Sequence, residues 1–259
     1  MRVGIIGTGK VATSFAIAIK KHINWLKIIG IYDINRDVLS NVAKLLNVKM
    51  LPPEEIVKTG DAVFFGTPDD EIEKAYKSIE HFIKKDQYLF HFSGVHRADV
   101  LKKGLYASIH PIFSFTKIVK NFEGIYFGIE GKEKAVELSK KILRGLGAKW
   151  IKINPSYKTF YHLMCVFASN MVQGMLYVAE RMGKTAGIKN PLEITEKLTQ
   201  EALKNAIREG PQKALTGPVK RGDKRTIEMH RKALKNTPPI LELYDLLCEL
   251  LIQMKKEVP

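Results

Sequence analysis

The sequence has little cysteine and no evident hydrophobic run of membrane length. Its two cysteines, Cys165 and Cys248, form no C-x-x-C pair, and such sparse use of cysteine fits a reducing cytoplasm. The apolar stretch Val11–Ile19 is too short to span a membrane and lacks a convincing cleavage site for a signal peptide. We therefore expect a soluble, cytoplasmic chain with no membrane partner and no metal site.

Acidic residues are scarce relative to basic ones. The 259 residues include 42 Lys and Arg against 27 Asp and Glu, for a formal net charge of +15. This excess is spread over both halves of the chain, and most of the cations are lysine, whereas base readout relies more on arginine. The pattern is typical of a solvated lysine-rich surface, which also attracts anionic cofactors and substrates. We expect no nucleic-acid partner.

The most informative motif is G-x-G-x-x-A within the first dozen residues, between an apolar run and an expected helix at Lys10–Lys21. In a dinucleotide-binding loop, the first glycine permits a tight turn and the second lets the backbone approach the pyrophosphate. The small third residue allows close packing, and the helix N-terminus favours the anion. An ordinary glycine turn is the alternative. The predicted contact residues are Gly7, Thr8, Gly9, Lys10, Val11 and Ala12.

The end of the next expected strand, 28–33, bears on which dinucleotide binds. Asp33 stands where a ribose-binding carboxylate is expected, which favours NAD. Asn35 and Arg36 follow at once, and an arginine near this position can accommodate the 2′-phosphate of NADP. We predict NADP, with Asp33 turned aside and Arg36 on the phosphate. NAD remains the alternative.

The order of the expected elements predicts two domains. Short runs rich in β-branched and aromatic residues alternate with helical patterns at first, which indicates an α/β fold with a parallel, doubly wound sheet. The later expected strands are 61–67, 87–93, 105–110, 124–130 and 149–153, with helices at 69–84 and 132–146. From Asn154-Pro155 onward the pattern is all helical. Its expected helices are one long helix to about Gly183, one to Gly210, one capped by Asp223 and one to about Glu257. We place a dinucleotide-binding domain at residues 1–152 and an all-α domain at 153–259.

Polar residues follow several of these strands, whose carboxyl ends face the cofactor in a doubly wound sheet. Each of them is also an ordinary turn or capping residue. His110 is the strongest candidate for chemistry, because an imidazole with a pKa near 6.5 can take a proton as a hydride leaves a carbinol. The expected contacts are Thr67, Pro68 and Asp69 at the middle of the cofactor, and Ser93, Gly94 and His110 near the nicotinamide.

Two further polar sets lie in the helical half. On a regular helix of about 100° per residue, His162, Ser169 and Asn170 share one face with Gln173 and Tyr177. This stripe is either a wall of the substrate cleft or a buried network between helices. In the loop Leu215–Asp223, Arg221 suits a carboxylate or phosphate, although the loop is in any case a connection between helices.

Taken together, these residues resemble a known family over essentially the whole chain. The order of their motifs resembles that of proteins that join a Rossmann-like NAD(P)-binding domain to a helical DUF2520 domain. These proteins belong to the 6-phosphogluconate-dehydrogenase-like group. The related prephenate dehydrogenases have a strand-end serine and a His-Pro similar to those here, which implies a serine–histidine pair at the transferring carbon. The Lys-x-x-Asn-Asn pattern of hydroxyacid dehydrogenases is missing from the long helix. The motifs in order are G-x-G-x-x-A, Pro68-Asp69-Asp70, His91-Phe-Ser93-Gly94, Ser108-Ile-His110-Pro111, Tyr161-His162 with Ala168-Ser169-Asn170, and Thr216-Gly-Pro with Arg221-Gly-Asp223.

We therefore predict an NAD(P)-dependent oxidoreductase that transfers a hydride between the nicotinamide and a small, anionic hydroxy or keto substrate. Two alternatives stay open, an imine reductase similar to pyrroline-5-carboxylate reductase and a cofactor-binding sensor without turnover. We expect a homodimer through the helical domain, because the long helix is apolar around most of its circumference. The predicted roles are His110 as general acid/base, Ser93 orienting the hydroxyl, His162, Ser169 and Asn170 lining the pocket, and Arg221 anchoring the anionic group.

Overall fold

The computed structural model describes residues 1–256, so the expected helix end near Glu257 lies outside the described residues. The chain divides into two compact units, the first covering Met1–Ser169 and the second beginning at Asn170. This division falls later than the domain boundary we placed at residue 152. The reason is that the first turns of the long helix pack on the sheet of the first unit, where Lys158 and Tyr161 are buried.

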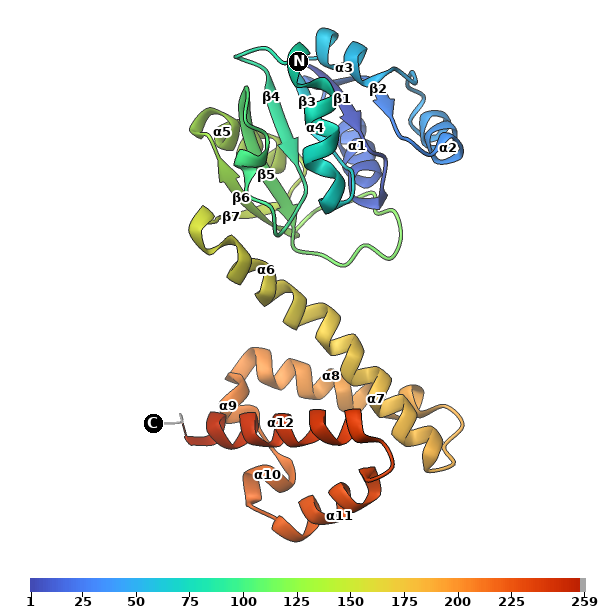
Figure 1. Ribbon diagram of the computed structural model, residues 1–259, viewed down its shortest axis with the longest axis vertical. Coiled ribbons are helices and arrows are strands. Elements are labelled where there is room, and N and C mark those ends of the chain that lie inside the picture. The colour runs from blue at the N-terminus through green and yellow to red at the C-terminus, as the bar shows by residue number, and fades with distance from the viewer. Residues whose placement is uncertain (257–259) are drawn as a thin grey trace. The chain divides into compact units, whose positions relative to one another are not determined.

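The first unit is built on a seven-stranded sheet in the order β2-β1-β3-β4-β5-β6-β7 (Figure 1). Strands β1 to β5 run parallel, which confirms the expected α/β, doubly wound class. The order reverses beside β1, which has β2 on one side and β3 on the other, and ligands bind such sheets at this switch point. The strands are β1 Arg2–Ile6, β2 Lys27–Tyr32, β3 Ala62–Phe65, β4 Tyr88–His91, β5 Leu105–Pro111, β6 Tyr126–Gly131 and β7 Lys149–Lys152.

One pairing departs from the expected parallel arrangement. Strand β6 is antiparallel to β5, and β7 is parallel to β6. The connection 112–125 contains no helix or strand, whereas a parallel return needs a crossover, usually a helix, to the opposite edge of the sheet. As a result β6 starts at the edge where β5 ends, and His110 pairs with Gly128.

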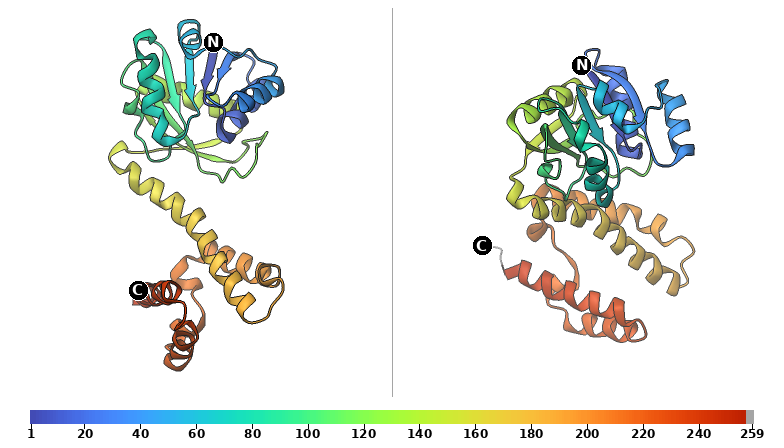
Figure 2. Two further views of the ribbon diagram at one scale, coloured as in Figure 1. Left: turned by 45° about the vertical axis from the view of Figure 1, so that its right-hand side comes forward. Right: turned by 45° about the horizontal axis from the view of Figure 1, so that its top comes forward.

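Helices cover both faces of this sheet (Figures 1 and 2). On one face, Phe15 of the first helix packs against the rings of Phe64 and Phe92. On the other face, Phe65 and Tyr76 belong to a second apolar core. The first face carries α1 Lys10–His22, α2 Arg36–Leu46 and α5 Glu133–Gly145, and the second carries α3 Pro53–Thr59 and α4 Ile72–Ile79. Helices α2 and α3 are additional to those expected from the sequence.

The long helix is less regular than expected. It runs without a break from Pro155 to Thr185, but a π-helical turn interrupts it at Phe167–Met171. Because a π turn holds an extra residue, the residues after it leave the face that a regular helix would give them. The placing of Gln173 and Tyr177 with His162 assumed a regular helix, and it stays a prediction. The parts of the helix are a 3-10 turn Pro155–Tyr157, α6 Lys158–Val166, the π turn and α7 Val172–Thr185.

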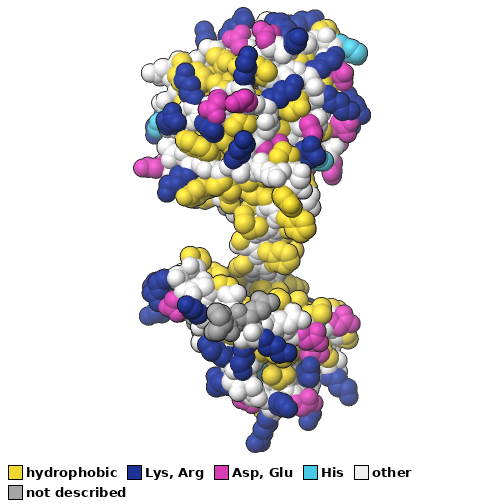
Figure 3. Space-filling model, turned by 90° about the vertical axis from the view of Figure 1, so that its left-hand side faces the viewer, with side chains coloured by type: hydrophobic (Ala, Val, Ile, Leu, Met, Phe, Trp, Pro, Cys, Tyr) yellow, Lys and Arg dark blue, Asp and Glu magenta, His cyan; other side chains and the backbone are white. Residues whose placement is uncertain are grey.

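By length and composition alone, this helix is apolar enough to cross a membrane, contrary to the expectation that no run is that long. Its first turns belong to the sheet domain, since Lys158 pairs with Glu130 there. Phe160 in these turns and Phe167 further along the helix are nevertheless 71% and 66% exposed. Hydrophobic side chains gather along the helix (Figure 3). The exposed apolar surface therefore begins on the side of the first turns that does not pack on the sheet.

The second unit is helical throughout its described residues, as expected. The predicted loop Leu215–Asp223 is mostly a short helix, which ends where Gly222 adopts a left-handed φ of +71°. Asp223 caps the next helix as predicted, because its Oδ1 accepts the N–H of Thr226 at 3.0 Å. The remaining helices are α8 Pro191–Glu209, α9 Pro211–Ala214, α10 Gly217–Arg221, α11 Lys224–Leu234 and α12 Pro238–Lys256.

Candidate active site

The first part of the site is a tight crossing of the loops that follow β1 and β3. Gly7 has a φ of +89°, and a Cβ there would lie 2.6 Å from the carbonyl carbon of Gly66. A Cβ on Gly66 would collide in turn with the side chain of Ala12. The two loops and α1 therefore pack only with glycine at positions 7 and 66 and a small residue at position 12. Small residues at Gly7 and Ala12 were predicted for this reason.

Gly9 stands at the N-cap of α1 and is under no such packing constraint. Its φ is −59°, and a Cβ on it would meet only the Gly66 carbonyl oxygen, at 3.4 Å. The first turn of α1 carries no acidic residue, and Lys10 beside it is exposed. The helix therefore presents backbone amides and the positive end of its dipole at an open position, which suits a phosphate.

The loop after β3 contributes a buried hydroxyl without a protein partner. Within residues 1–256, Thr67 Oγ1 is the buried side-chain polar atom that makes no hydrogen bond. Buried polar atoms normally have a partner, so an orphan at the switch point indicates a ligand atom in the functional state. Pro68 and Asp69 follow it and are exposed. A nicotinamide dinucleotide therefore fits the residues at this edge of the sheet.

Asp33 is directed at the glycine loop. Its Oδ2 accepts hydrogen bonds from the backbone N–H of Thr8 at 2.7 Å and from the Thr8 hydroxyl at 2.8 Å. Its Oδ1 accepts the N–H of Asn35 at 2.9 Å. The Asn35 side chain caps α2, of which Arg36 is the exposed first residue. Both carboxylate oxygens of Asp33 are thus engaged by the protein itself.

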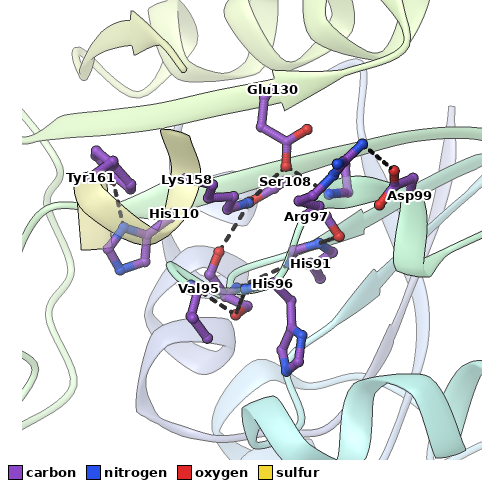
Figure 4. Close-up of polar contacts among 12 residues, drawn as sticks. His91, Val95, His96, Arg97, Asp99, Ser108, His110, Glu130, Lys158 and Tyr161 are labelled. Carbon is purple, nitrogen blue, oxygen red and sulfur yellow. Dashed lines mark hydrogen bonds and ion pairs between the residues drawn. The ribbon is translucent and has the colours of Figure 1, made fainter. Parts of the chain in front are cut away.

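The second part of the site is a set of polar side chains on the α3/α4 face of β4, β5 and β6 (Figure 4). Side chains alternate along a strand, so His110 and Ser108 of β5 share this face with Glu130 of β6. The start of α6 covers them with Lys158 and Tyr161. A polar surface on the sheet is thereby enclosed by a polar face of the helix.

Glu130 and Lys158 form a buried ion pair. Lys158 Nζ lies 2.8 Å from Glu130 Oε1, and their side chains are 2% and 4% exposed. The same oxygen accepts the N–H of Ala98 at 2.6 Å. Burial lowers the pKa of Lys158, while the carboxylate of Glu130 opposes that shift. The sequence analysis did not predict this ion pair. The available signal was that Lys158, Tyr161 and His162 are spaced to share one face of the helix.

Ser93 lies in a turn that His91 helps to fix. The buried His91 ring accepts the Ser93 N–H at Nδ1, over 3.1 Å, so its Nε2 carries the proton and faces the carbonyl of Arg97 at 3.3 Å. Burial holds the pKa of His91 well below its usual range. Ser93 Oγ accepts N–H groups of Val95 and His96 at 3.3 and 3.0 Å. The Ser93 hydroxyl therefore shapes the loop that carries Gly94.

His110 meets Gly94 and His162 at the end of β5. A Cβ on Gly94 would lie 2.8 Å from His110 Nε2 and 2.5 Å from His162 Cδ2, so only glycine fits between the two rings. The ring centroids are 6.0 Å apart. Burial, followed by the charges of His162 and Lys158, lowers the pKa of His110 to about 4. The expected value near 6.5 was therefore too high, because the sequence does not reveal burial.

The remaining predicted residues lie at or beyond the π turn. Ser169 Oγ donates to the Cys165 carbonyl at 2.7 Å, and Asn170 is the first residue of the second unit. Arg221 ends α10 in that unit and is exposed. The structure thus brings His110, His162 and Gly94 together within the first unit. The pocket role of Ser169, Asn170 and Arg221 stays a prediction.

Residues 125–250 match the domain of unknown function DUF2520. This match covers 126 of the 259 residues. The match starts just before β6, so this domain supplies Glu130, Lys158, Tyr161 and His162, whereas the glycine loop and His110 precede it. No curated protein matches the sequence.

Solved structures similar to this chain share its fold over nearly the full length. A Bacteroides fragilis protein provisionally described as an NADP oxidoreductase is 20% identical, with a TM-score of 0.82 over 97% of this chain and 98% of that one. A Thermotoga maritima protein is 29% identical, with a TM-score of 0.76 over 98% of each chain. Prephenate dehydrogenase from Aquifex aeolicus is 18% identical, with a TM-score of 0.59 over 98% and 99%. The resemblance to Rossmann-like proteins with a DUF2520 domain is confirmed.

The buried ion pair predicts a large stability effect. Lys158→Met leaves the Glu130 carboxylate buried without its cation, and removing one partner of a buried pair costs about 3–5 kcal/mol. Urea unfolding should show this loss. The matched control is Lys140→Met, which breaks the more exposed pair with Glu137 and should change the free energy of unfolding by less than about 1 kcal/mol. Equal effects of the two substitutions would contradict the structural importance of the buried pair.

Proposed function

We propose that this protein is an NADP-dependent oxidoreductase whose dinucleotide lies along the carboxyl ends of β1, β3, β4 and β5. The observation that carries the proposal is the open N-terminus of α1 at Gly9 beside the unpartnered Thr67 hydroxyl. Gly9 and Thr67 would hold the pyrophosphate, and Gly94 would lie near the nicotinamide. The bound cofactor supplies or accepts a hydride. The protein's own residues bind, orient and stabilise the reacting oxygen.

His110 is the residue that we assign to the reacting oxygen of the substrate. It lies at the carboxyl end of β5, at the same sheet edge as the glycine loop, and its Nε2 faces Gly94. With a pKa of about 4 the ring is neutral at physiological pH. We assign His162, Ser169 and Asn170 to the substrate pocket, Ser93 to orienting the hydroxyl, and Arg221 to an anionic group of the substrate. A small hydroxy or keto acid is the substrate class that matches these groups.

NADP is supported over NAD by the environment of Asp33. Its carboxylate oxygens already accept hydrogen bonds from Thr8 and Asn35, so they are less available to a ribose diol. Arg36 is exposed at the start of α2, so its guanidinium is available for a 2′-phosphate. The net charge of +15 favours the more anionic cofactor.

Gly9→Val should weaken NADPH binding by roughly 100-fold or more, because the new side chain fills the position of the pyrophosphate. The fold should be retained, since a Cβ at this position has room. Fluorescence titration with NADPH and NADH measures both affinity and preference. Unchanged affinity in this variant would contradict the proposed site, and NADH binding at least about tenfold tighter to the wild type would contradict the choice of NADP.

Two glycines serve as controls for this experiment. Gly174→Val alters another open glycine, in α7, and should leave dinucleotide affinity unchanged. Gly7→Ala should instead destabilise the fold, because Gly7 has a φ of +89° and its Cβ would meet the backbone of Gly66. The comparison separates loss of a binding position from loss of structure.

His110→Ala tests the chemical role. A panel of small carbonyl and hydroxy acids, assayed at the absorbance of reduced nicotinamide, identifies a substrate first. The variant should then lose about 10²–10³-fold in turnover and keep its dinucleotide affinity, because one polar group at the reacting oxygen is removed. Near-normal turnover would transfer the role to His162. Tight dinucleotide binding with no turnover across the panel would favour the sensor alternative.

A homodimer through the helical half is our proposal for the assembly. Of the described residues, α7 includes no buried side chain and α12 includes one, Cys248. An apolar cavity of about 470 Å³ also opens within this unit, where Met175, Met182 and Leu247 are among the lining residues. Apolar helices with so little cover need a partner surface, and a second copy of the chain supplies a matching one.

Sedimentation at micromolar protein should therefore give a dimer. Met175→Glu places a charge on the apolar surface and should shift the protein toward monomer. Ile34→Glu is the matched control, because Ile34 is 89% exposed in the first unit. A wild-type monomer that is independent of concentration would contradict the proposal.

A further inference from the structure

We propose that Tyr161 is a positioning residue that fixes neutral His110 as its Nε2–H tautomer. The ring then presents a hydrogen-bond donor, rather than an acceptor, beside Gly94. The two nitrogens of His110 face different partners: Nδ1 lies 2.6 Å from Tyr161 Oη, and Nε2 faces the backbone of Gly94. The state of Nδ1 therefore decides what Nε2 offers to a ligand.

Tyr161 is held firmly enough to act in this way. It lies on α6 and is 8% exposed, with its ring perpendicular to that of His110 at a centroid separation of 5.6 Å. The phenol approaches β6 closely because residue 128 is glycine: a Cβ there would lie 2.5 Å from Tyr161 Cζ. The ion pair of Lys158 with Glu130, three residues earlier, anchors the same turn of α6.

The position of the proton follows from the hydrogen-bonding groups around Tyr161. In one arrangement the Tyr161 O–H donates to His110 Nδ1. The phenol is a good donor, and the unprotonated imidazole nitrogen is a better acceptor than the neighbouring thiol. If Nδ1–H donated to Oη instead, the phenol hydrogen would turn to the neighbouring Cys165 thiol, which is a weak acceptor. The first arrangement pairs the stronger groups. A neutral imidazole with an unprotonated Nδ1 carries its proton on Nε2.

The groups that face His110 favour the neutral ring. They are His162, Lys158, Tyr161 and Gly94, together with Cys165 behind the phenol. None of these is an anionic carboxylate in contact with the imidazole, and Glu130 is engaged by Lys158 and Ala98. The positive charge of a protonated His110 would therefore have no contacting carboxylate among these groups to stabilise it.

A donor at Nε2 specifies the chemistry of the ligand, and this step rests on the proposed function. A neutral N–H can stabilise negative charge on oxygen, whereas it cannot accept the proton of an alcohol. The ligand that suits this donor is a carbonyl compound, whose oxygen gains negative charge as the compound is reduced. Its carbon gains a C–H bond from the hydride of the reduced dinucleotide, the π electron pair moves to oxygen, and a solvent proton completes the hydroxyl. Nε2–H holds the oxygen throughout.

Nitrogen NMR of the protein labelled in histidine tests the tautomer without any substrate. Long-range proton–nitrogen correlations at pH 7 distinguish the protonated ring nitrogen from the unprotonated one, and loss of a signal in His110→Asn assigns His110. The expected result is a protonated Nε2 and an unprotonated Nδ1. A proton on Nδ1 in the wild type would overturn the proposal.

Three variants show which group fixes the tautomer. Tyr161→Phe keeps the ring and removes the hydroxyl, so a population with protonated Nδ1 should appear. Cys165→Ala should leave the His110 signals unchanged, because the thiol does not hold the phenol hydrogen. Tyr244→Phe is the matched control, since Tyr244 Oη contacts His230 Nδ1 at 2.8 Å in the second unit and should affect only His230. An unaltered His110 tautomer in Tyr161→Phe would also overturn the proposal.

These outcomes are separate from those of the proposed function. If Nε2 carries the proton and Tyr161→Phe changes it, the positioning role holds even where no dinucleotide binds. If dinucleotide binding and turnover are found but Nδ1 carries the proton, the function stands and the tautomer proposal fails. With a substrate in hand, the carbonyl form should turn over at least about tenfold faster at pH 7 than the alcohol form does with oxidised dinucleotide.

Discussion

The site depends on the buried ion pair between Glu130 and Lys158. Two charges that are almost fully enclosed are stable only when they remain together, so the pair fixes where α6 meets the sheet. Tyr161 and His162 lie one turn further along that helix and face His110 for this reason. A helix that started elsewhere on the sheet would bring different side chains to the end of β5.

A second constraint acts at the other end of the same sheet edge. Gly7, Gly66 and Ala12 allow the loops after β1 and β3 to cross at backbone contact. Gly9 remains open at this crossing, and the buried Thr67 hydroxyl has no protein partner. Strands β1, β3, β4 and β5 are parallel, so their carboxyl ends lie along one edge. The parallel sheet therefore aligns the glycine loop with an enclosed histidine, although the two lie about 100 residues apart in the sequence.

The parts of the fold that follow local rules could be predicted from the sequence. The glycine loop, the strand runs and the Asp223 cap all rest on residues close together in the chain, and they are in place. The ion pair, the reversed direction of β6 and the lowered pKa of His110 depend on contacts between distant segments, which periodicity does not contain. The π turn had no signal on a helical wheel, which assumes the same rotation for every residue.

The central claim is that one edge of the sheet binds a nicotinamide dinucleotide with its reactive ring at His110. A crystal structure of the protein with NADP⁺ tests this claim most directly. We expect the pyrophosphate on the amides that follow Gly9, a hydrogen bond from the Thr67 hydroxyl to the cofactor, and the nicotinamide against Gly94 within reach of His110. A dinucleotide bound elsewhere, or one whose nicotinamide points away from Gly94 and His110, would contradict it.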